Sequence, residues 1–465
     1  MTNSNSNFHI LTVGWGFDLI ENLWDRIQTV SGFPFSHILQ PSIDQHALAK
    51  RANKSNCFCL RDNLHMKLPP PEREWLAELE QPGVPTIHNM IMGDRVLRTL
   101  DYTESLAYAT FLAKRLECLY RQIAPSIIIG SFDGVQGSIA MAVARKLGIP
   151  WFALNFTTIP TGLSGFCTGM TPDTSFIVRP ADTTALRALA EKVLCEFETR
   201  KTVVPAYSSA NSLGMIIKRL PKHIQAFHKS VITFRSDKFT QYSAQRLVRQ
   251  YLRKRRNLLF LPKQWFIDTP PDTPYLFIGL HMQPESSIDV WAPFYSNQFS
   301  VIEAIARSTP PTHQVLVKLH KSDADNYSRQ QLVQLRRLPG VQLVSPFALS
   351  RTFIEKASLV LAIQGNIALE AALLGQPVLV FGDTKFMELP SVTKVNRITD
   401  LPEQIRGKLS EVKPTREEII RGFMSYLSYY SSGCYNDWEV IPTETEIKSL
   451  ASQFEALRDF VEGRE

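Results

Sequence analysis

Short apolar runs alternate with helically spaced apolar stripes along the chain. The first run, Phe8–Gly14, meets a glycine-rich turn at Gly14–Gly16, and apolar residues then recur at helical spacing from Leu19 to Ile27. Short apolar runs predict buried strands, and stripes with a period of about 3.6 residues predict amphipathic helices. Strand, glycine turn and helix in this order are typical of the start of a parallel α/β domain.

A second unit of the same kind follows, and its pattern is clearer. It begins with an amphipathic helix over 101–122, followed by a short strand over 126–129. An alanine-rich helix over 138–147 and a strand over 149–153 complete it. This order favours a right-handed parallel crossover. We therefore expect residues 1–205 to form a first Rossmann-like domain.

The pattern changes after this domain. Residues 206–268 have apolar positions at helical spacing and predict helices in a basic linker. Beyond the proline-rich boundary 269–274, five strands alternate with helices, at 275–280, 314–319, 341–344, 358–363 and 377–381. This alternation indicates a doubly wound sheet over 269–414. The fold class is therefore α/β, with two Rossmann-like domains facing across a cleft and C-terminal helices over 415–465 packing across the junction.

Composition agrees with a folded protein of several domains. Of the 465 residues, 44% are hydrophobic and 20% are charged. These fractions are typical of globular proteins and exclude disorder and coiled coil as the main state. Six cysteines are too few for a disulfide scaffold. The pair Cys57 and Cys59 has no second cluster nearby and is a weak metal signal, so we expect no metal site.

Positive charge is concentrated in one part of the chain. The net charge is +7, and the segment Lys218–Lys263 contains thirteen Lys or Arg and one acid, Asp237. Such a run suits the surface of an anionic membrane, or it is a solvated helical face. Nucleic acid is a weaker reading, because aromatic residues are sparse in the run and no nucleic-acid-binding motif is present.

The sequence also favours a cytoplasmic protein. Residues 1–17 contain no basic residue and no apolar core of a signal peptide, so we do not expect secretion by that route. The longest uncharged stretch, Leu147–Pro172, contains prolines, glycines and threonines that a lipid-exposed helix would not tolerate. We expect a cytoplasmic chain associated with the inner face of the plasma membrane through its basic run.

The most informative motif is Gln364–Pro377, which follows a predicted strand and opens a predicted helix. The first amides of such a helix lack carbonyl partners and can hold a phosphate, and Gly365 permits close approach. Asn366 begins the helix, and Glu370 lies about one turn further on, where a carboxylate can accept hydrogen bonds from ribose hydroxyls. The structural alternative is a turn glycine followed by a solvated glutamate.

Two further loops carry polar residues past the ends of predicted strands, where ligands of open α/β sheets bind. Lys318 lies near the end of one strand, and His320 and Lys321 follow it. Together they form a plausible phosphate contact, or a basic surface turn. The other loop, His281–Asp289, contains Gln283, Glu285 and Ser286. The structural alternative for this loop is a capped helix start with Ser286 or Ser287 as the N-cap.

Together the three motifs resemble the capsular polysaccharide synthesis family, which includes Kdo transferases and related GT-B enzymes. The matching segments are L-H-x-Q-P-E-S-S at Leu280–Ser287, V-K-x-H-K at Val317–Lys321, and G-N-x-A-L-E-A-x-L-x-G-x-P-V at Gly365–Val378. The resemblance covers roughly residues 245–390. This sequence departs from the family at Lys321, where the family often has proline.

The resemblance implies a glycosyltransferase that moves a sugar from a nucleotide-sugar donor to a surface polysaccharide or glycolipid acceptor. CMP-Kdo and other CMP- or UDP-sugars are the donors that it suggests. It implies that the second domain binds the donor and the first domain binds the acceptor. The donor residues would be Gln283, Ser286, Lys318, His320, Lys321, Gly365, Asn366 and Glu370.

The general base is then expected in the first domain or at the rim of the cleft. Asp133, in the loop after the strand 126–129, is the first candidate, although it could equally cap the following helix. Glu285 is the second. GT-B enzymes usually stabilise the departing phosphate with helix amides and basic groups, so we expect no metal ion and no cofactor. The alternatives are a nucleotide-sugar epimerase or hydrolase of the same fold, and a non-catalytic carbohydrate-binding protein.

Overall fold

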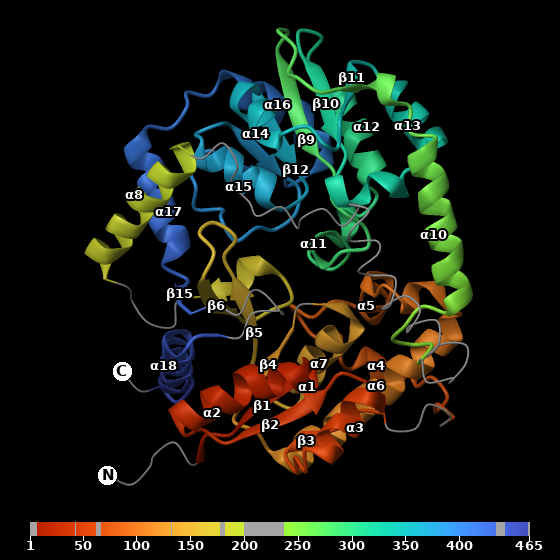
Figure 1. Ribbon diagram of the computed structural model, residues 1–465, viewed down its shortest axis with the longest axis vertical. Helices are drawn as coiled ribbons and strands as arrows, with labels where there is room; N and C mark the ends of the chain where they lie inside the picture. The colour runs from red at the N-terminus through yellow and green to blue at the C-terminus, as the bar shows by residue number, and fades with distance from the viewer. Residues whose placement is uncertain are drawn as a thin grey trace. The chain divides into compact units, whose positions relative to one another are not determined.

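The computed structural model describes residues 7–41, 43–61, 67–131, 133–176, 182–199, 237–433 and 442–463. The chain folds into two compact units (Figure 1). The first comprises the described residues of Met1–Ala181, Phe234–Tyr242 and Ser428–Glu465, and the second those of Asp182–Thr233 and Ser243–Leu427. Each unit is built around one sheet in which parallel pairing dominates, so the predicted α/β class with two Rossmann-like domains is confirmed.

The sheet of the first unit has the order β15-β6-β5-β4-β1-β2-β3, with β7 paired to β6. Its strands are β1 Ile10–Trp15, β2 Phe35–Leu39, β3 Cys57–Phe58, β4 Ile127–Gly130, β5 Trp151–Phe156, β6 Leu163–Cys167, β7 Ser175–Phe176 and β15 Ser431–Ser432. Strands β1 to β5 pair in parallel, and β6 pairs antiparallel with β5, β7 and β15. The chain fills the sheet from β1 outward on one side and then from β4 on the other, as in a Rossmann sheet.

Helices cover this sheet and close its core. They are α1 Phe17–Leu19, α2 Asp25–Ser31, α3 Ile43–Arg51, α4 Arg73–Ala77, α5 Ile87–Gly93, α6 Tyr102–Ile123, α7 Gly134–Lys146 and α18 Glu444–Val461. Helix α18 packs on α2, and the ring of Phe454 lies 5.9 Å from that of buried Trp24. The last helix of the chain therefore completes the core around the first strand.

The sheet of the second unit is wholly parallel, with the order β14-β13-β12-β9-β10-β11-β8. Its strands are β8 Phe266–Ile267, β9 Tyr275–Gly279, β10 Gln314–Lys318, β11 Val341–Val344, β12 Leu359–Ala362, β13 Val378–Val380 and β14 Val392–Lys394. Strands β9 to β13 match the five predicted strands; β8 and β14 were not predicted, because two- and three-residue strands leave almost no apolar run.

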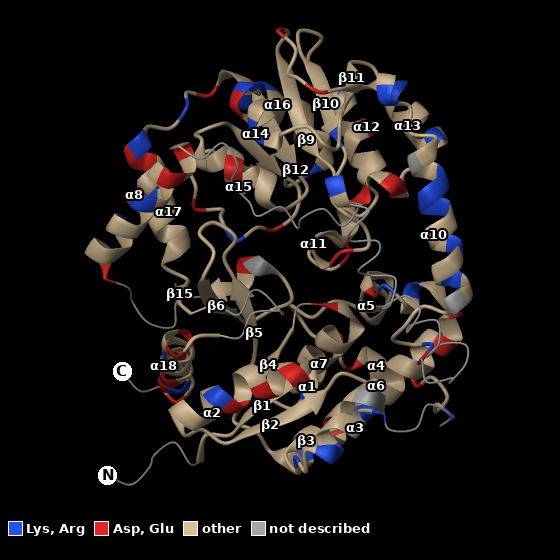
Figure 2. Cartoon of the chain, viewed as in Figure 1, with Lys and Arg blue, Asp and Glu red and all other residues tan. Residues whose placement is uncertain are grey.

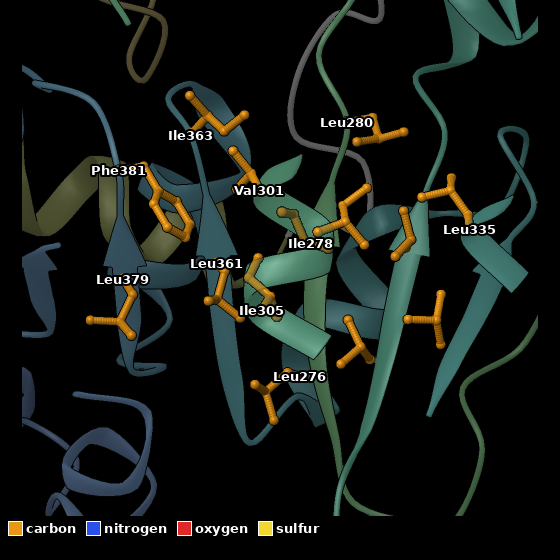
Figure 3. Packing of buried hydrophobic residues seen from close by; sticks show 14 of the residues in the cluster. Leu276, Ile278, Leu280, Val301, Ile305, Leu335, Leu361, Ile363, Leu379 and Phe381 are labelled. Carbon is orange, nitrogen blue, oxygen red and sulfur yellow. The ribbon is translucent and has the colours of Figure 1, made fainter. Parts of the chain in front are cut away.

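Helices surround this second sheet (Figure 1). They are α8 Thr183–Thr199, α10 Ala244–Leu259, α11 Ser286–Asp289, α12 Gln298–Ser308, α13 Arg329–Arg336, α14 Ser350–Lys356, α15 Asn366–Leu373, α16 Leu401–Ser410 and α17 Arg416–Leu427. A 3-10 helix, η8, spans Lys321–Asn326. Figure 3 shows Val301 and Ile305 of α12 beside Ile278 and Leu361 of the sheet, all of them buried members of one core cluster. Burial of apolar side chains on both faces explains why these strands read as continuous apolar runs.

The structure divides the chain at different places from the expected boundaries at 205, 268 and 414. Helix α8 lies in the second unit, because it packs along α17, where Arg187 pairs with Glu417 at 2.7 Å. The proline-rich segment 269–274 lies inside the second unit, between β8 and β9. The C-terminal helices are shared: α17 belongs to the second unit and α18 to the first.

The described residues of the basic run 218–263 belong to both units. Its first part, up to residue 236, lies outside the described residues. Asp237 makes an ion pair with Arg61 at 2.8 Å, with both side chains 4% exposed. Lys238 pairs with Glu104 in the same unit. These two residues hold the segment on the first unit, and the described basic residues that remain belong mainly to α10. No helix in the described part of the chain has the length and hydrophobicity that a bilayer span requires.

Candidate functional site

In the second unit, β9 and β12 are neighbours at the point where the strand order reverses. From β9 the chain continues to β10 and β11 on one side, and from β12 it continues to β13 and β14 on the other. The loops that leave β9 and β12 therefore diverge, and ligands of open α/β sheets bind in the crevice outside the strand ends at this point. The predicted donor residues lie in these two loops, in the helices that the loops lead into, or at the end of β10 and in the segment that follows it.

The loops after β9 and β12 are joined by a hydrogen bond. The backbone N–H of Gln364 donates to Nε2 of His281 over 3.2 Å. Because Nε2 accepts, the ring is neutral and carries its proton on Nδ1. Burial, with the charge of His320 as a smaller cause, lowers the pKa of His281 to about 4. The sequence placed His281 in a polar loop without giving it a role; its tie to Gln364 depends on a pairing of distant strands.

Gly365 is required beside this histidine. Its φ of +94° lies in the left-handed region, which favours glycine. A Cβ atom at this position would also stand 2.9 Å from Cε1 of His281. The N-cap of α15 therefore lies directly against the imidazole. Helix α15 begins at the partly exposed Asn366 and has eight residues, and its first amides lie at the positive end of the helix.

Glu370 and Lys318 are buried near this helix start. Glu370 is 9% exposed, and its burial raises its pKa to about 7, against the opposing charges of Arg351 and Lys318. Lys318, at the end of β10, is 7% exposed, and burial together with the charge of Lys321 lowers its pKa to about 8. The prediction of a solvated glutamate is therefore excluded. Two buried charges within electrostatic range are costly unless something compensates them.

The hydrogen bonds of Lys318 are only partly used within the described chain. Its Nζ donates to the carbonyl oxygen of Pro346 over 3.0 Å. An ammonium group has three hydrogens to donate, so two remain for further acceptors. A buried ammonium with spare donors is suited to an anion.

His320 lies at the start of η8, just past the end of β10. The backbone N–H of Ser322 donates to its Nδ1 over 3.2 Å, so the neutral ring carries its proton on Nε2. Burial and the charge of Lys318 lower the pKa of His320. Lys321 is exposed. The ring of His320 therefore offers one N–H donor within electrostatic range of Lys318 and His281.

Gln283 is used by the loop itself. Its side-chain amide donates to Asp289 over 2.9 Å and to the carbonyl of Ser296 over 3.0 Å, and its Oε1 accepts from Gln298 over 3.0 Å. Its backbone N–H donates to buried Asp323 over 3.2 Å. The structure thus gives Gln283 a role in bracing the loop, with Asp289, Gln298 and Asp323 as its partners.

The Glu285–Ser286 segment forms the start of α11. Glu285 is the N-cap residue in backbone conformation, not Ser286 or Ser287, and its carboxylate accepts from Oγ of Ser287 over 2.9 Å. Ser286 is the first helical residue and is partly exposed. A helix of four residues contributes little to a binding site through its own backbone. Glu285 remains a candidate base and Ser286 a candidate donor contact because of their position in the loop after β9.

A polar cavity of about 240 Å³ adjoins the braced loop. It is lined by Gln283, Ser296, Asn297, Gln298, Phe299, Asp323, Asn326, Tyr327 and Gln331. Asp323 accepts from Asn326 over 3.2 Å and pairs with Lys254 of α10 over 3.5 Å. The cavity is smaller than a typical pocket for a whole ligand and is bounded by groups that bind one another.

Asp133 lies at the corresponding reversal point of the first unit, between β1 and β4. It is the N-cap residue of α7, but its side chain makes no capping bond there. Its carboxylate, about half exposed, pairs with Arg95 at 2.9 Å. The backbone N–H of Val135 donates instead to Asp94 over 3.1 Å. The carboxylate of Asp133 is thus accessible to solvent and forms an ion pair with Arg95.

Asp323 and Asp325 both lie in η8. Lys254 pairs with both residues, at 3.5 and 3.3 Å. Within the ranges that the structure describes, no group of three or more His, Cys, Asp or Glu side chains is arranged to hold a metal ion.

No protein-family model matches the sequence, and no curated protein matches it. Among solved structures, the chain is similar to the β-Kdo 2,4 transferase KpsC of Thermosulfurimonas dismutans, with 11% identity, 90% of each chain covered and a TM-score of 0.37. It is also similar to the UDP-GlcNAc 2-epimerase of Neisseria meningitidis bound to UDP-GlcNAc, with 13% identity, 90% of this chain and 98% of that chain covered, and a TM-score of 0.29. Likenesses this distant assign no activity to this chain.

Proposed function

We propose that this protein is a GT-B-type glycosyltransferase that transfers a sugar from a nucleotide-sugar donor to a surface polysaccharide or glycolipid. The observation that carries the proposal is the site at the strand reversal of the second unit. There, buried Lys318 and Glu370 lie within electrostatic range of each other, and the latter belongs to the helix that opens against His281. The sequence motifs of this site resemble those of the capsular polysaccharide synthesis family.

The donor phosphate is assigned to the start of α15 and to Lys318. The helix offers amides at its positive end, and Lys318 offers two hydrogens and a charge. As the bond between sugar and phosphate breaks, negative charge grows on the phosphate oxygen. The same groups, with the Nε2–H of His320, stabilise that charge without reorganising.

The ribose is assigned to Glu370. Burial raises the pKa of its carboxyl to about 7, so the charged form is disfavoured before the donor binds. Ribose hydroxyls donate hydrogen bonds, which stabilise the charged form of an acceptor carboxylate. Donor binding therefore favours loss of the Glu370 proton, and Lys318 favours the resulting charge further.

The acceptor is assigned to the first unit, with Asp133 as the general base. Its carboxylate takes the proton of the attacking hydroxyl, the hydroxyl oxygen forms the new bond to the sugar, and the nucleotide departs. Glu285 is the second candidate base. No metal ion and no cofactor has a role in this sequence of steps.

A nucleotide-sugar epimerase or hydrolase is the second candidate function. It is favoured by one feature, because Glu370, His281 and His320 place three titratable groups with shifted pKa values in the same unit. Acid and base groups that act on the donor sugar would produce an epimer or a free sugar, and the reaction would need no acceptor. A non-catalytic carbohydrate-binding protein would bind the donor or a saccharide and release no product.

The test is a thermal-shift screen against CMP, UDP and GDP and their sugars, followed by product analysis with the donor that binds. A ligand at about 100 times its Kd stabilises the native state by about 2.7 kcal/mol. We expect one nucleotide to raise the melting temperature of the wild type and of a Glu403→Ala control, and to lose that effect in Glu370→Ala. Glu403 is an exposed acid on α16.

The products then separate the candidates. Transfer of the sugar to an oligosaccharide or lipid-linked acceptor supports the glycosyltransferase, and an epimer or free sugar formed without an acceptor supports the alternative. Binding without any product supports the non-catalytic protein. If no nucleotide changes the melting temperature, or if Glu370→Ala responds like the wild type, the assigned donor site is wrong.

A further inference from the structure

Helix α10 is basic along its whole length. Its sequence, Ala244–Leu259, contains five arginines and one lysine, and no acidic residue occurs between Asp237 and Asp268. Figure 2 shows this row of cations on α10. Four of them, Arg246, Arg249, Arg253 and Arg256, are exposed. The helix therefore presents a positive surface that contains none of the residues assigned to the donor.

One side of α10 is attached to the second unit through η8. Lys254 pairs with Asp325 at 3.3 Å, Asn257 donates to the carbonyl of the same residue over 3.1 Å, and Arg253 donates to Asn326 over 2.7 Å. These contacts fix the orientation of the helix on η8. Helical periodicity then determines which residues lie on the side of α10 that is not attached to η8.

The remaining surface carries an exposed apolar stripe. Leu247, Tyr251 and Leu259 recur at intervals of four or eight residues, with Val248 and Leu252 beside them. Their exposed fractions are large for apolar side chains, at 61% for Leu252 and 81% for Leu259. By helical spacing, Arg249 and Arg256 flank the stripe on one side and Lys254 flanks it on the other. Arg255 lies within the stripe, stacked over Tyr251 at 5.1 Å.

We propose that this stripe of α10, defined by Leu247, Val248, Tyr251, Leu252 and Leu259, docks in the surface of an anionic bilayer. A helix with an apolar stripe and a cationic polar face lies in the plane of the membrane interface. Its apolar side chains enter the acyl boundary, and the long arginines at its flanks extend to the lipid phosphates. This arrangement places a catalytic domain at a surface that carries lipid-linked acceptors.

Charge and apolar character together favour a membrane over the other occupants. A nucleic acid would be bound by the cations, but it would leave the aliphatic stripe exposed to water. A second copy of this helix would bring two rows of cations together without acidic residues to balance them, because α10 has none. An anionic bilayer satisfies both features at once.

The experiment measures binding of the full-length protein to phosphatidylcholine vesicles with and without phosphatidylglycerol. We expect binding to the anionic vesicles only, and a decrease as salt is raised, because exposed charges are screened over about 8 Å at physiological ionic strength. Each cation near the surface contributes about fivefold to partitioning, so Arg249→Gln/Arg256→Gln should weaken binding roughly 30-fold. Val248→Gln/Leu252→Gln should weaken it at all salt concentrations.

Two variants serve as matched controls. Arg397→Gln removes a cation with a 78% exposed side chain, and Val412→Gln removes an apolar residue that is 89% exposed, both in the second unit and outside α10. Both should bind vesicles like the wild type.

Equal binding to neutral and anionic vesicles, or α10 variants that bind like the controls, would overturn the proposal. The proposal would also be overturned if a single-stranded oligonucleotide, at equal charge concentration, displaced the protein from vesicles. The same holds if a stripe variant changed the oligomeric mass of the protein and left its vesicle binding unchanged. Nucleotide binding is measured in parallel, so failure of this proposal is distinguishable from failure of the donor site.

Discussion

The imidazole of His281 joins the two loops that meet at the strand reversal of the second unit, since its Nε2 accepts from the backbone N–H of Gln364 over 3.2 Å. The residue next to Gln364, Gly365, lies so close to the ring that a Cβ would stand 2.9 Å from Cε1. The side chain of His281 therefore links the end of β9 to the start of α15.

The first prediction concerns Gly365. Gly365→Ala should destabilise the protein by more than about 1 kcal/mol, because the backbone has a positive φ and the added methyl meets the His281 ring. Gly407→Ala is the matched control, since Gly407 lies within α16 and has nothing within 4 Å. We expect it to stabilise by about 0.5–1 kcal/mol. Urea unfolding of both variants checks this, and equal effects would show that Gly365 is not constrained.

The second prediction concerns the pH dependence of stability. The pKa of His281 is lowered from 6.5 to about 4, so the unfolded chain binds more protons between these values. The contribution of His281 to stability should therefore fall as pH falls from 6.5 to 4, by no more than about 1.4 kcal/mol per pH unit. His281→Gln should lack this component, and exposed His88→Gln should retain it.

At neutral pH, His281→Gln should also cost about 1–3 kcal/mol if it leaves the Gln364 N–H without an acceptor. Unfolding free energies at pH 5 and pH 7.5 separate the two effects. An identical pH profile for His281→Gln and the wild type would contradict a neutral His281 ring with a lowered pKa.

The third prediction concerns Glu370, whose effects on stability and on binding should have opposite signs. Its pKa is raised from 4.5 to about 7, so its contribution to stability is lost as pH rises through this range. Glu370→Gln should therefore be more stable than the wild type at pH 8, by about 1–3 kcal/mol. The same variant should bind nucleotide about tenfold more weakly. Calorimetry between pH 6 and pH 8 should show affinity rising with pH in the wild type alone.

The fourth prediction concerns Lys318. Lys318→Met removes a charge-assisted hydrogen bond to the donor phosphate and should weaken nucleotide binding about 10- to 100-fold. The control is Lys356→Met, which removes an exposed lysine from α14. Binding of the nucleoside should be affected much less than binding of the nucleotide. Equal losses for both ligands would show that Lys318 acts on the fold and not on the phosphate.

The fifth prediction concerns Asp133. Asp133→Asn should lower the transfer rate by about 10²–10⁴-fold, because the acceptor hydroxyl loses its base, while donor binding stays unchanged. The control is Asp18→Asn, an exposed acid on α1. Turnover that stays near normal in Asp133→Asn would move the base elsewhere, and Glu285→Gln is then the next variant to measure.

Much of the candidate site followed from local sequence, for a physical reason. A parallel strand buried on both faces needs a run of apolar residues, so β9, β10 and β12 were visible as such runs. Parallel strands share one carboxyl edge, which brings Lys318, His320, Gly365 and Glu370 toward the same side of the sheet. The polar residues after each run therefore indicated a site before any distance was known.

Other roles depended on contacts between distant segments. Gln283 looked like a ligand residue, and its amide instead braces the loop through Ser296 and Asp289. The buried Asp323 and the tie from His281 to Gln364 each need two strands to be placed side by side. No local pattern encodes such pairs, because each half is an ordinary polar residue in its own segment.

The sequence by itself determined the two α/β units and the edge of the second sheet at which polar residues gather, because apolar runs and glycine turns act locally. The tertiary structure alone decided where the units divide. Helix α8 joins the second unit through Arg187 and Glu417, and α18 returns to the first through Trp24 and Phe454. It also decided that Lys318 and Glu370 are buried, since burial is set by the elements that pack over a residue and not by its neighbours in the chain.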